Sequence, residues 1–340
     1  IPLLKQWYQR RVHGGGKGDL IAGLIVIMAV PESMSAKLKQ TTQVFEEGRL
    51  STRSFQVEES HPASPPKPLL IVSPAAEGAY PVLLFLHGTS LSNAFYSLLL
   101  RHVSSHAFIV VAPQIYSLIP PSGPTEIDAA AAVADWLPVG LPSILPDKVL
   151  PTIHKLAVAG HSRGGKAAFS MVLGRAASKV SFSALIGVDP VAGCSGRTQI
   201  KPKLLTYVPG SLDLGVPVAV VGTGLGSEPR SCLVWKPCAP DGVSHKEFFR
   251  ECRPPCAHFV AAEYGHMDVL DDAPPGVAGK VSGCLCKNGK GPRELARRGV
   301  GGVMVAFLRA FLDGEDSDLK VILADPSVAP IKLDPLEFIP

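Results

Sequence analysis

Apolar and polar positions alternate in blocks from residue 41 to the C-terminus. Short apolar runs predict buried strands, and apolar side chains at helical spacing predict helices at 93–105, 126–137 and 292–312 and directly after Ser162. Strands that alternate with helices imply right-handed crossovers and a largely parallel sheet. The first two strands have no helix between them and fit an antiparallel start of the sheet. The predicted strands span residues 54–58, 69–72, 81–86, 108–112, 155–159, 184–188, 216–221 and 258–262.

One turn between a predicted strand and a helix carries the pattern Gly-x-Ser-x-Gly, at residues 160–164. In this context the pattern predicts a nucleophile elbow, a tight turn that lifts the hydroxyl of Ser162 above the sheet. We expect Gly160 and Gly164 to be required because a Cβ at either position would clash with neighbouring backbone. The backbone N–H of Arg163, at the start of the helix, can stabilise an oxyanion. Ser162 is therefore the candidate nucleophile.

The order of elements fits the α/β-hydrolase fold, with a mostly parallel central sheet and helices on both faces. In this fold the nucleophile is followed along the chain by an acid and then a histidine, each on a loop after a strand. His266 follows the last predicted strand and is the leading candidate for the histidine. His245 and His258 are weaker candidates, because one lies within a loop and the other begins a predicted strand.

The position of the acid is less constrained by the sequence. Asp189 directly follows the strand at 184–188, whereas Asp213 and Glu228 flank the next strand, where many hydrolases place this group. All three therefore stay open from position alone. Asp268 and Asp271 lie so close to His266 in the chain that we expect them to shape its loop.

The loop after residue 86 is expected to supply the second oxyanion donor, the backbone N–H of Thr89, since this loop meets the elbow in the fold. Gly88 lets the loop turn under the substrate, and His87 is interpreted as a loop-shaping residue. The segment 114–121 is apolar and lies where hydrolases place a lid.

The first forty residues differ from the rest. Residues 20–30 are almost wholly apolar, but this core is shorter than the roughly 20 residues that span a bilayer. It is compatible with a signal-peptide core, a fragment or a helix associated with a membrane surface. Residues 18–23 and 31–35 resemble the start of the first membrane helix of sulfate-permease-type transporters, without the later helices. We therefore treat 1–40 as an extension outside the fold and 41–340 as the catalytic domain.

The composition of the chain narrows the classes of function that it can have. The chain has 340 residues, 46% of them hydrophobic, which suffices for a large core, and its formal net charge of +4 is too small and too dispersed to favour nucleic-acid binding. Neither the pair Cys252 and Cys256 nor the pair Cys284 and Cys286 has the spacing of a zinc site, so we expect no metal and no cofactor. Disulfides among the C-terminal cysteines remain open.

Several ordered blocks of the chain from about residue 41 onward resemble plant chlorophyllases. This resemblance implies hydrolysis of the phytyl ester of chlorophyll to chlorophyllide and phytol, a lipophilic substrate, and a chloroplast location, with the cytosol or endomembranes as alternatives. It also implies that Asp189 is the acid of the triad. One departure is the segment 89–92, where relatives tend to carry bulky residues. The blocks are residues 100–106, 160–166, 184–193, 220–226, 249–256, 264–268 and 303–308.

Two other functions remain open at this point. A general lipase or carboxylesterase of the same fold would hydrolyse short acyl esters but not chlorophyll. A non-catalytic binding protein of the same fold is disfavoured because Ser162, Asp189 and His266 are all present.

Overall fold

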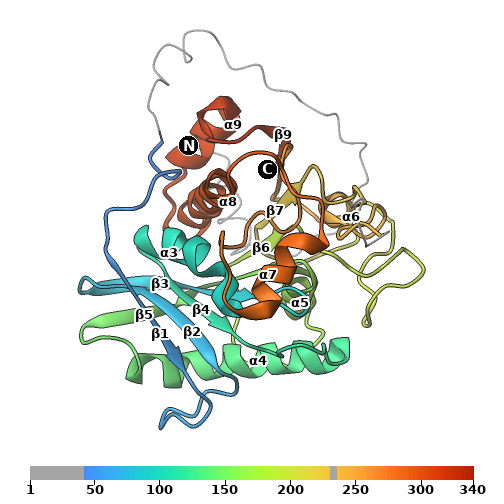
Figure 1. Cartoon of the computed structure of the whole chain (residues 1–340). Helices are drawn as coiled ribbons and strands as arrows, with labels where there is room; N and C mark the ends of the chain where they lie inside the picture. Colours follow the sequence, from blue (N-terminus) through green and yellow to red (C-terminus); the bar gives the residue numbers. More distant parts are fainter. Residues whose placement is uncertain (1–41, 230–235) are drawn as a thin grey trace, which may run out of the picture.

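The computed structural model describes residues 42–229 and 236–340 (Figure 1). The predictions made for residues 1–40 lie outside this range. Nine strands form one sheet in the order β1-β2-β4-β3-β5-β6-β7-β8-β9. The strands are β1 (Thr52–Val57), β2 (Leu69–Pro74), β3 (Gly78–Leu86), β4 (Ile109–Pro113), β5 (Val149–His161), β6 (Ala184–Val188), β7 (Val218–Thr223), β8 (Cys256–Ala261) and β9 (Leu333–Ile339).

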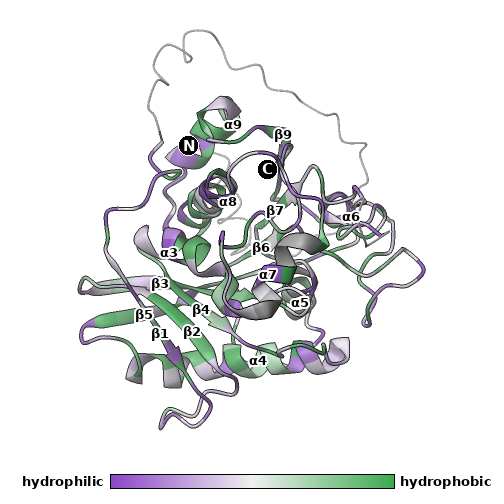
Figure 2. Ribbon diagram, viewed as in Figure 1, coloured by the Kyte–Doolittle hydropathy of each residue, from purple (hydrophilic) through white to green (hydrophobic). Residues whose placement is uncertain are grey.

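The six central strands, from β4 to β8 across the sheet, are parallel, and the strands on either side of them are antiparallel. Strands β4, β6, β7 and β8 are buried along their full length, as parallel strands covered on both faces must be. The antiparallel strand β2 is buried along its full length as well. Figure 2 shows this as hydrophobic colour along the central strands. The antiparallel start formed by β1 and β2 is confirmed.

Two hydrophobic cores lie on the two faces of the sheet. One contains side chains from α3 (Ser97–Ser105), α8 (Arg293–Leu308) and α9 (Ser317–Ala324), and the other from α4 (Gly123–Gly140), α5 (Arg163–Val172) and α6 (His245–Glu251). In Figure 1, α8 and α4 lie on opposite sides of the sheet. The predicted α/β-hydrolase architecture is confirmed.

Several elements differ from the sequence prediction. Strand β5 begins at Val149, and the helix predicted at 292–312 is α8 followed by a π-helical turn (Arg309–Asp313). The elements α6, α7 (Gly276–Leu285), α9 and β9 were not predicted from the sequence. Strand β9 carries a proline and two acidic residues at an exposed edge, so its pairing with β8 has little local signature. No helix among the described residues is long and apolar enough to cross a membrane.

Candidate active site

The elbow joins β5 to α5. Ser162 has φ 57° and ψ −124°, a backbone conformation that L-residues rarely adopt. A Cβ on Gly160 would lie 2.3 Å from the carbonyl oxygen of Gly164, and a Cβ on Gly164 would lie 2.4 Å from those of Leu86 and His87. Both glycines are therefore required by close backbone contacts, as the sequence predicts.

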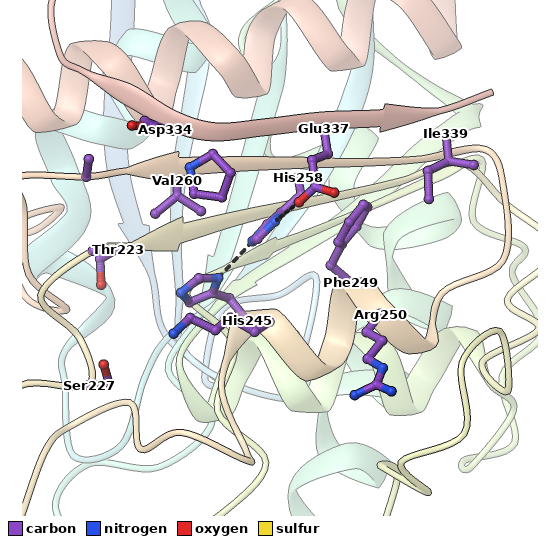
Figure 3. A pocket seen from close by; sticks show the side chains of 14 residues that line it. Thr223, Ser227, His245, Phe249, Arg250, His258, Val260, Asp334, Glu337 and Ile339 are labelled. Atoms are coloured by element: carbon purple, nitrogen blue, oxygen red, sulfur yellow. Dashed lines mark hydrogen bonds and ion pairs between the residues drawn. The ribbon is translucent and has the colours of Figure 1, made fainter. Parts of the chain in front are cut away.

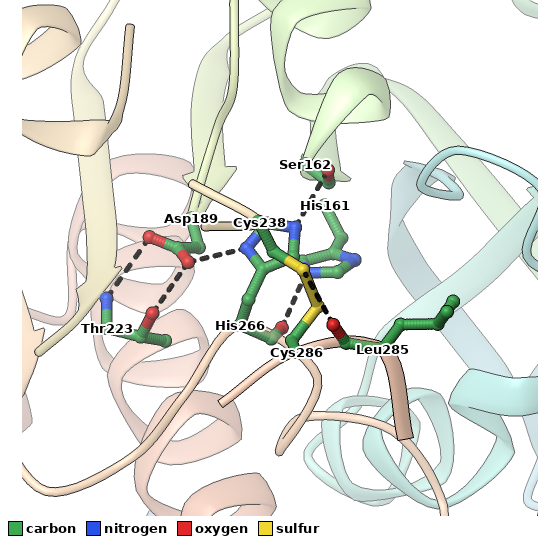
Figure 4. Close-up of a disulfide and its surroundings, with 8 residues drawn as sticks. All are labelled: His161, Ser162, Asp189, Thr223, Cys238, His266, Leu285 and Cys286. Carbon is green, nitrogen blue, oxygen red and sulfur yellow. Dashed lines mark hydrogen bonds and ion pairs between the residues drawn. A yellow bond between two sulfur atoms is a disulfide. The ribbon is translucent and has the colours of Figure 1, made fainter. Parts of the chain in front are cut away.

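Three side chains from separate loops meet at this turn (Figure 4). Ser162 Oγ lies 2.9 Å from His266 Nε2, and His266 Nδ1 lies 2.6 Å from Asp189 Oδ2. Asp189 follows β6 and His266 lies in the loop after β8, at the same edge of the sheet as the elbow. All three side chains are buried. The arrangement is that of a hydrogen-bonded nucleophile, base and acid.

Asp189 is held by a residue that the sequence analysis did not identify. Its Oδ2 also accepts a hydrogen bond from Thr223 Oγ1 at 2.6 Å, and its Oδ1 accepts one from the Thr223 N–H at 3.2 Å. Burial alone would raise the pKa of Asp189, but the hydrogen bond and charge of His266, with those of Thr223 and His245, outweigh it and lower the pKa to about 2. Thr223 ends β7, beside β6, and this position is the signal that could have indicated it.

The other acids that sequence position left open lie away from His266. Asp213 is exposed and forms an ion pair with Arg253 at 2.5 Å, and Glu228 is exposed. Asp268 accepts hydrogen bonds from the N–H groups of Gly265 and Gly289, so it shapes the loop of His266 as predicted.

The alternative histidines pair with each other rather than with Ser162. His245 Nδ1 lies 2.8 Å from His258 Nε2, beside a cavity of about 640 Å³ between α6, β8 and β9 (Figure 3). Burial lowers the pKa of His258 to about 3, so this imidazole is neutral in the folded protein. Neither residue joins the hydrogen bonds of Ser162.

Two backbone N–H groups near Ser162 are the candidates to donate to an oxyanion. Arg163 is the first residue of α5, where N–H groups have no partner within the helix. Within residues 42–229 and 236–340, neither its N–H nor that of Thr89 donates a hydrogen bond to another group. A Cβ on Gly88 would lie 3.2 Å from Ser162 Cβ, so the loop that carries Thr89 passes directly beside Ser162.

His87 has the loop-shaping role that the sequence predicts. Its Nδ1 donates to the carbonyl of Gly88 at 2.8 Å, and its Nε2 accepts from the N–H of Ile115 at 3.1 Å. Burial lowers the pKa of His87 to about 4, which keeps the ring neutral. His87 therefore ties the loop after β3 to the start of the apolar segment at 114–121.

A buried ion pair anchors the other end of that segment. Arg163 Nε donates to Glu126 Oε2 at 2.6 Å, and its Nη2 donates to the carbonyl of Pro121 at 2.6 Å. Glu126 was not predicted from the sequence; it lies in the first turn of α4 and is 3% exposed. Between these anchors, Leu118 and Ile119 are 69% and 83% exposed.

A disulfide joins Cys238 to Cys286 next to the loop of His266 (Figure 4). The sequence left open whether the C-terminal cysteines form disulfides, and the structure pairs these two. The backbone after Cys286 packs so closely there that a Cβ on Gly265 would lie 1.8 Å from the carbonyl oxygen of Lys287. In the described ranges, no group of three or more His, Cys, Asp or Glu side chains is arranged to hold a metal ion.

Comparisons with known proteins agree with this architecture. A family model described as Chlorophyllase matches residues 40–340. Chlorophyllase-1 of Arabidopsis thaliana is 47% identical over 312 residues, which cover 90% of this chain and 96% of the relative. Chlorophyllase-1, chloroplastic, of Citrus unshiu is 50% identical over 304 residues, 88% of this chain and 89% of the relative. Chlorophyllase-2 of Arabidopsis thaliana is 50% identical over 274 residues, 79% and 86% of the two chains. The chain belongs to the chlorophyllase family.

Proposed function

We propose that this chain is a serine esterase that hydrolyses the phytyl ester of chlorophyll to chlorophyllide and phytol. Ser162 is the nucleophile, His266 the general base and Asp189 the acid that orients it. The observation that supports these roles is the continuous hydrogen bonding from Asp189 Oδ2 through the imidazole of His266 to Ser162 Oγ, at 2.6 and 2.9 Å. Membership of the chlorophyllase family supports the choice of ester.

The reaction proceeds in two halves. As Ser162 Oγ attacks the ester carbonyl carbon, its proton passes to His266 Nε2, and the carbonyl oxygen becomes an oxyanion that accepts from the N–H groups of Arg163 and Thr89. His266 then gives the proton to the phytol oxygen, and the acyl group stays on Ser162. Water attacks the acyl-enzyme with His266 again as base, which releases chlorophyllide and restores the serine. The ionised Asp189 holds the hydrogen on Nδ1 and stabilises the imidazolium.

Activity on chlorophyll a in detergent tests this proposal, with chlorophyllide and phytol measured separately. We expect Ser162→Ala to lower the rate by about 10⁴-fold, since Ser162 forms the acyl-enzyme. Ser170→Ala is the matched control, because this buried serine of the same helix bonds only the carbonyl of Lys166. Hydrolysis of short acyl esters without activity on chlorophyll would instead support a general carboxylesterase. Absence of hydrolysis of any ester would support a binding protein.

We also propose that residues 41–340 form one catalytic domain, acting in the chloroplast at a lipid surface. The continuous nine-stranded sheet supports the single domain, and the word chloroplastic in the names of two Citrus relatives supports the compartment. The exposed Leu118 and Ile119, on a segment tied to the loop of Thr89 by the hydrogen bond from Ser90 Oγ to the Leu118 carbonyl, support the lipid contact.

Co-sedimentation with lipid vesicles tests the lipid contact. We expect the double substitution Leu118→Asp, Ile119→Asp to abolish binding, because it places charges in the apolar contact. Val139→Asp is the matched control, since Val139 is also 83% exposed but lies at the C-terminal end of α4, roughly 25 Å from the first residue of that helix. Equal binding by both variants would contradict the proposal.

A further inference from the structure

A second line of buried hydrogen bonds runs beside the candidate triad, from the loop after β3 to the loop of His266. The N–H of Gly88 donates to Tyr96 Oη at 3.0 Å, and Tyr96 Oη lies 2.8 Å from His161 Nδ1. His161 Nε2 lies 2.9 Å from the backbone carbonyl oxygen of His266 (Figure 4). These hydrogen bonds therefore link the loop of Thr89, the residue before Ser162 and the backbone of His266.

Only one arrangement of hydrogens satisfies this line. A carbonyl oxygen can only accept, so His161 Nε2 carries the hydrogen. Burial lowers the pKa of His161 to about 3, so the ring is neutral and its Nδ1 is a bare acceptor for the Tyr96 hydroxyl. The phenol oxygen of Tyr96 in turn accepts from Gly88. Each polar atom is paired, and the direction of every hydrogen bond is determined.

The groups are also confined by packing. Tyr96 and His161 are both 0% exposed. The His161 ring lies between those of Tyr96 and His266, with centroid distances of 5.7 and 4.6 Å. A Cβ on Gly88 would lie 3.0 Å from His161 Nδ1. The contacts leave little room for the loop of Thr89 or the backbone of His266 to move independently.

We propose that Tyr96 and His161 are positioning residues that hold the loop of Thr89 and the backbone of His266 at a set separation around Ser162. This inference rests on the proposed ester hydrolysis. If His266 moves, its Nε2 leaves the hydrogen bond to Ser162 Oγ, and if Gly88 moves, the adjacent Thr89 N–H leaves the oxyanion. Both displacements affect the reacting atoms rather than the bulk of a bound phytyl ester, so they lower kcat more than they change KM.

The neutrality of His161 has a second consequence for catalysis. His266 becomes an imidazolium while the oxyanion exists, and a positive charge on the ring 4.6 Å away would oppose this change. A buried neutral imidazole can donate to the His266 carbonyl without adding charge. A lysine or arginine at this position would provide the donor but also the opposing charge.

The test compares variants by kcat and KM for ester hydrolysis and by the rate at which a fluorophosphonate labels Ser162. In labelling, Ser162 Oγ bonds to phosphorus, fluoride leaves and the serine proton passes to His266, so the rate reports the alignment of these groups without chlorophyll. We expect Tyr96→Phe and His161→Leu to lower kcat and the labelling rate by about 10- to 100-fold, with KM within about twofold. The variant that carries both substitutions should be no slower than His161→Leu, because each substitution alone already breaks the same line of hydrogen bonds.

His161→Gln should restore both rates to within about threefold of wild type, since its amide can donate to the His266 carbonyl and accept from Tyr96. His106→Leu is the matched control. His106 is buried, donates from Nε2 to the carbonyl of Glu46 at 2.9 Å and accepts from Arg309, but it has no contact with the elbow. This control should lose stability and keep kcat, with all variants assayed below their unfolding temperatures.

Three results would overturn the proposal: wild-type rates in Tyr96→Phe, no advantage of His161→Gln over His161→Leu, or an equal loss of kcat in His106→Leu. Tyr96→Phe keeps the ring volume, so it decides the question if His161→Leu does not fold. A wild-type protein that labels at Ser162 but leaves chlorophyll intact would refute the proposed substrate, and the labelling rates would still decide the role of Tyr96 and His161. A wild-type protein that does not label at all would refute both.

Discussion

Asp189→Asn keeps the shape of the candidate acid and removes its charge. In the structure every neighbour of this carboxylate is a donor: His266 Nδ1, Thr223 Oγ1 and the Thr223 N–H. The backbone N–H cannot change its role, so the amide oxygen of an asparagine must occupy the position of Oδ1. Its NH₂ group then faces His266 Nδ1. This contact is satisfied only if the imidazole carries its hydrogen on Nε2, the atom that must accept the proton of Ser162.

The expected loss follows from this tautomer and from the missing charge. A histidine held in the wrong tautomer costs about 10⁴-fold in kcat in a serine hydrolase, and the imidazolium also loses its counter-ion. We therefore expect kcat to fall by roughly 10³- to 10⁴-fold, which corresponds to about 4–5.5 kcal/mol in the activation barrier. KM should change little, because Asp189 is 0% exposed and lies behind His266.

The assay is release of phytol from chlorophyll a by purified variants whose thermal unfolding matches that of the wild type. Asp213→Asn and Glu228→Gln are the controls, because these exposed acids are the alternatives that sequence position leaves open, and both should keep near wild-type rates. An Asp189→Asn variant with more than about a tenth of the wild-type kcat would refute the reasoning. So would an inactive variant at either control position, which would place the acid on the later strand.

Two further predictions concern stability. Burial lowers the pKa of several histidines below the value that a histidine has in an unfolded chain. The unfolded state therefore binds more protons than the folded state below about pH 6.5. The free energy of unfolding should fall by about 1 kcal/mol per pH unit for each of these histidines, down to about pH 4. In urea unfolding at pH 7, 6 and 5, His106→Gln should make this decline shallower, and the exposed His154→Gln should not; an unchanged slope in His106→Gln contradicts the argument. The second prediction concerns the disulfide between Cys238 and Cys286, which are separated by 48 residues. Replacing both with serine should lower the free energy of unfolding by up to about 4 kcal/mol under non-reducing conditions, and equal urea midpoints would show that the disulfide does not stabilise the fold.

The elbow and the sheet could be read from the chain because their signals are local. A strand buried on both faces needs an uninterrupted apolar run, and the turn at Ser162 needs glycines within two residues on either side. Such constraints act between neighbours in sequence, so they leave a pattern. The parallel architecture followed from the same alternation of strands and helices.

The choice among Asp189, Asp213 and Glu228 did not follow from local pattern. Each follows or flanks a predicted strand, so position favoured Asp189 without excluding the other two, and family resemblance supplied the stronger argument for it before the fold was known. The tertiary structure separates these three acids. Asp189 is buried, with its Oδ2 2.6 Å from His266 Nδ1, whereas the other two are exposed. The catalytic roles stay predictions until the substitutions are measured.

The partners that surround the candidate triad were missed because they lie far away in the sequence. Thr223 reaches Asp189 across 34 positions, Glu126 reaches Arg163 across 37, and Tyr96 reaches the histidine before Ser162 across 65. No periodicity marks such residues, since any threonine at a strand end, and any glutamate or tyrosine near the start of a helix, has the same local appearance. Which of them meet depends on strand order and on how helices pack against the sheet, and these are properties of the folded chain alone.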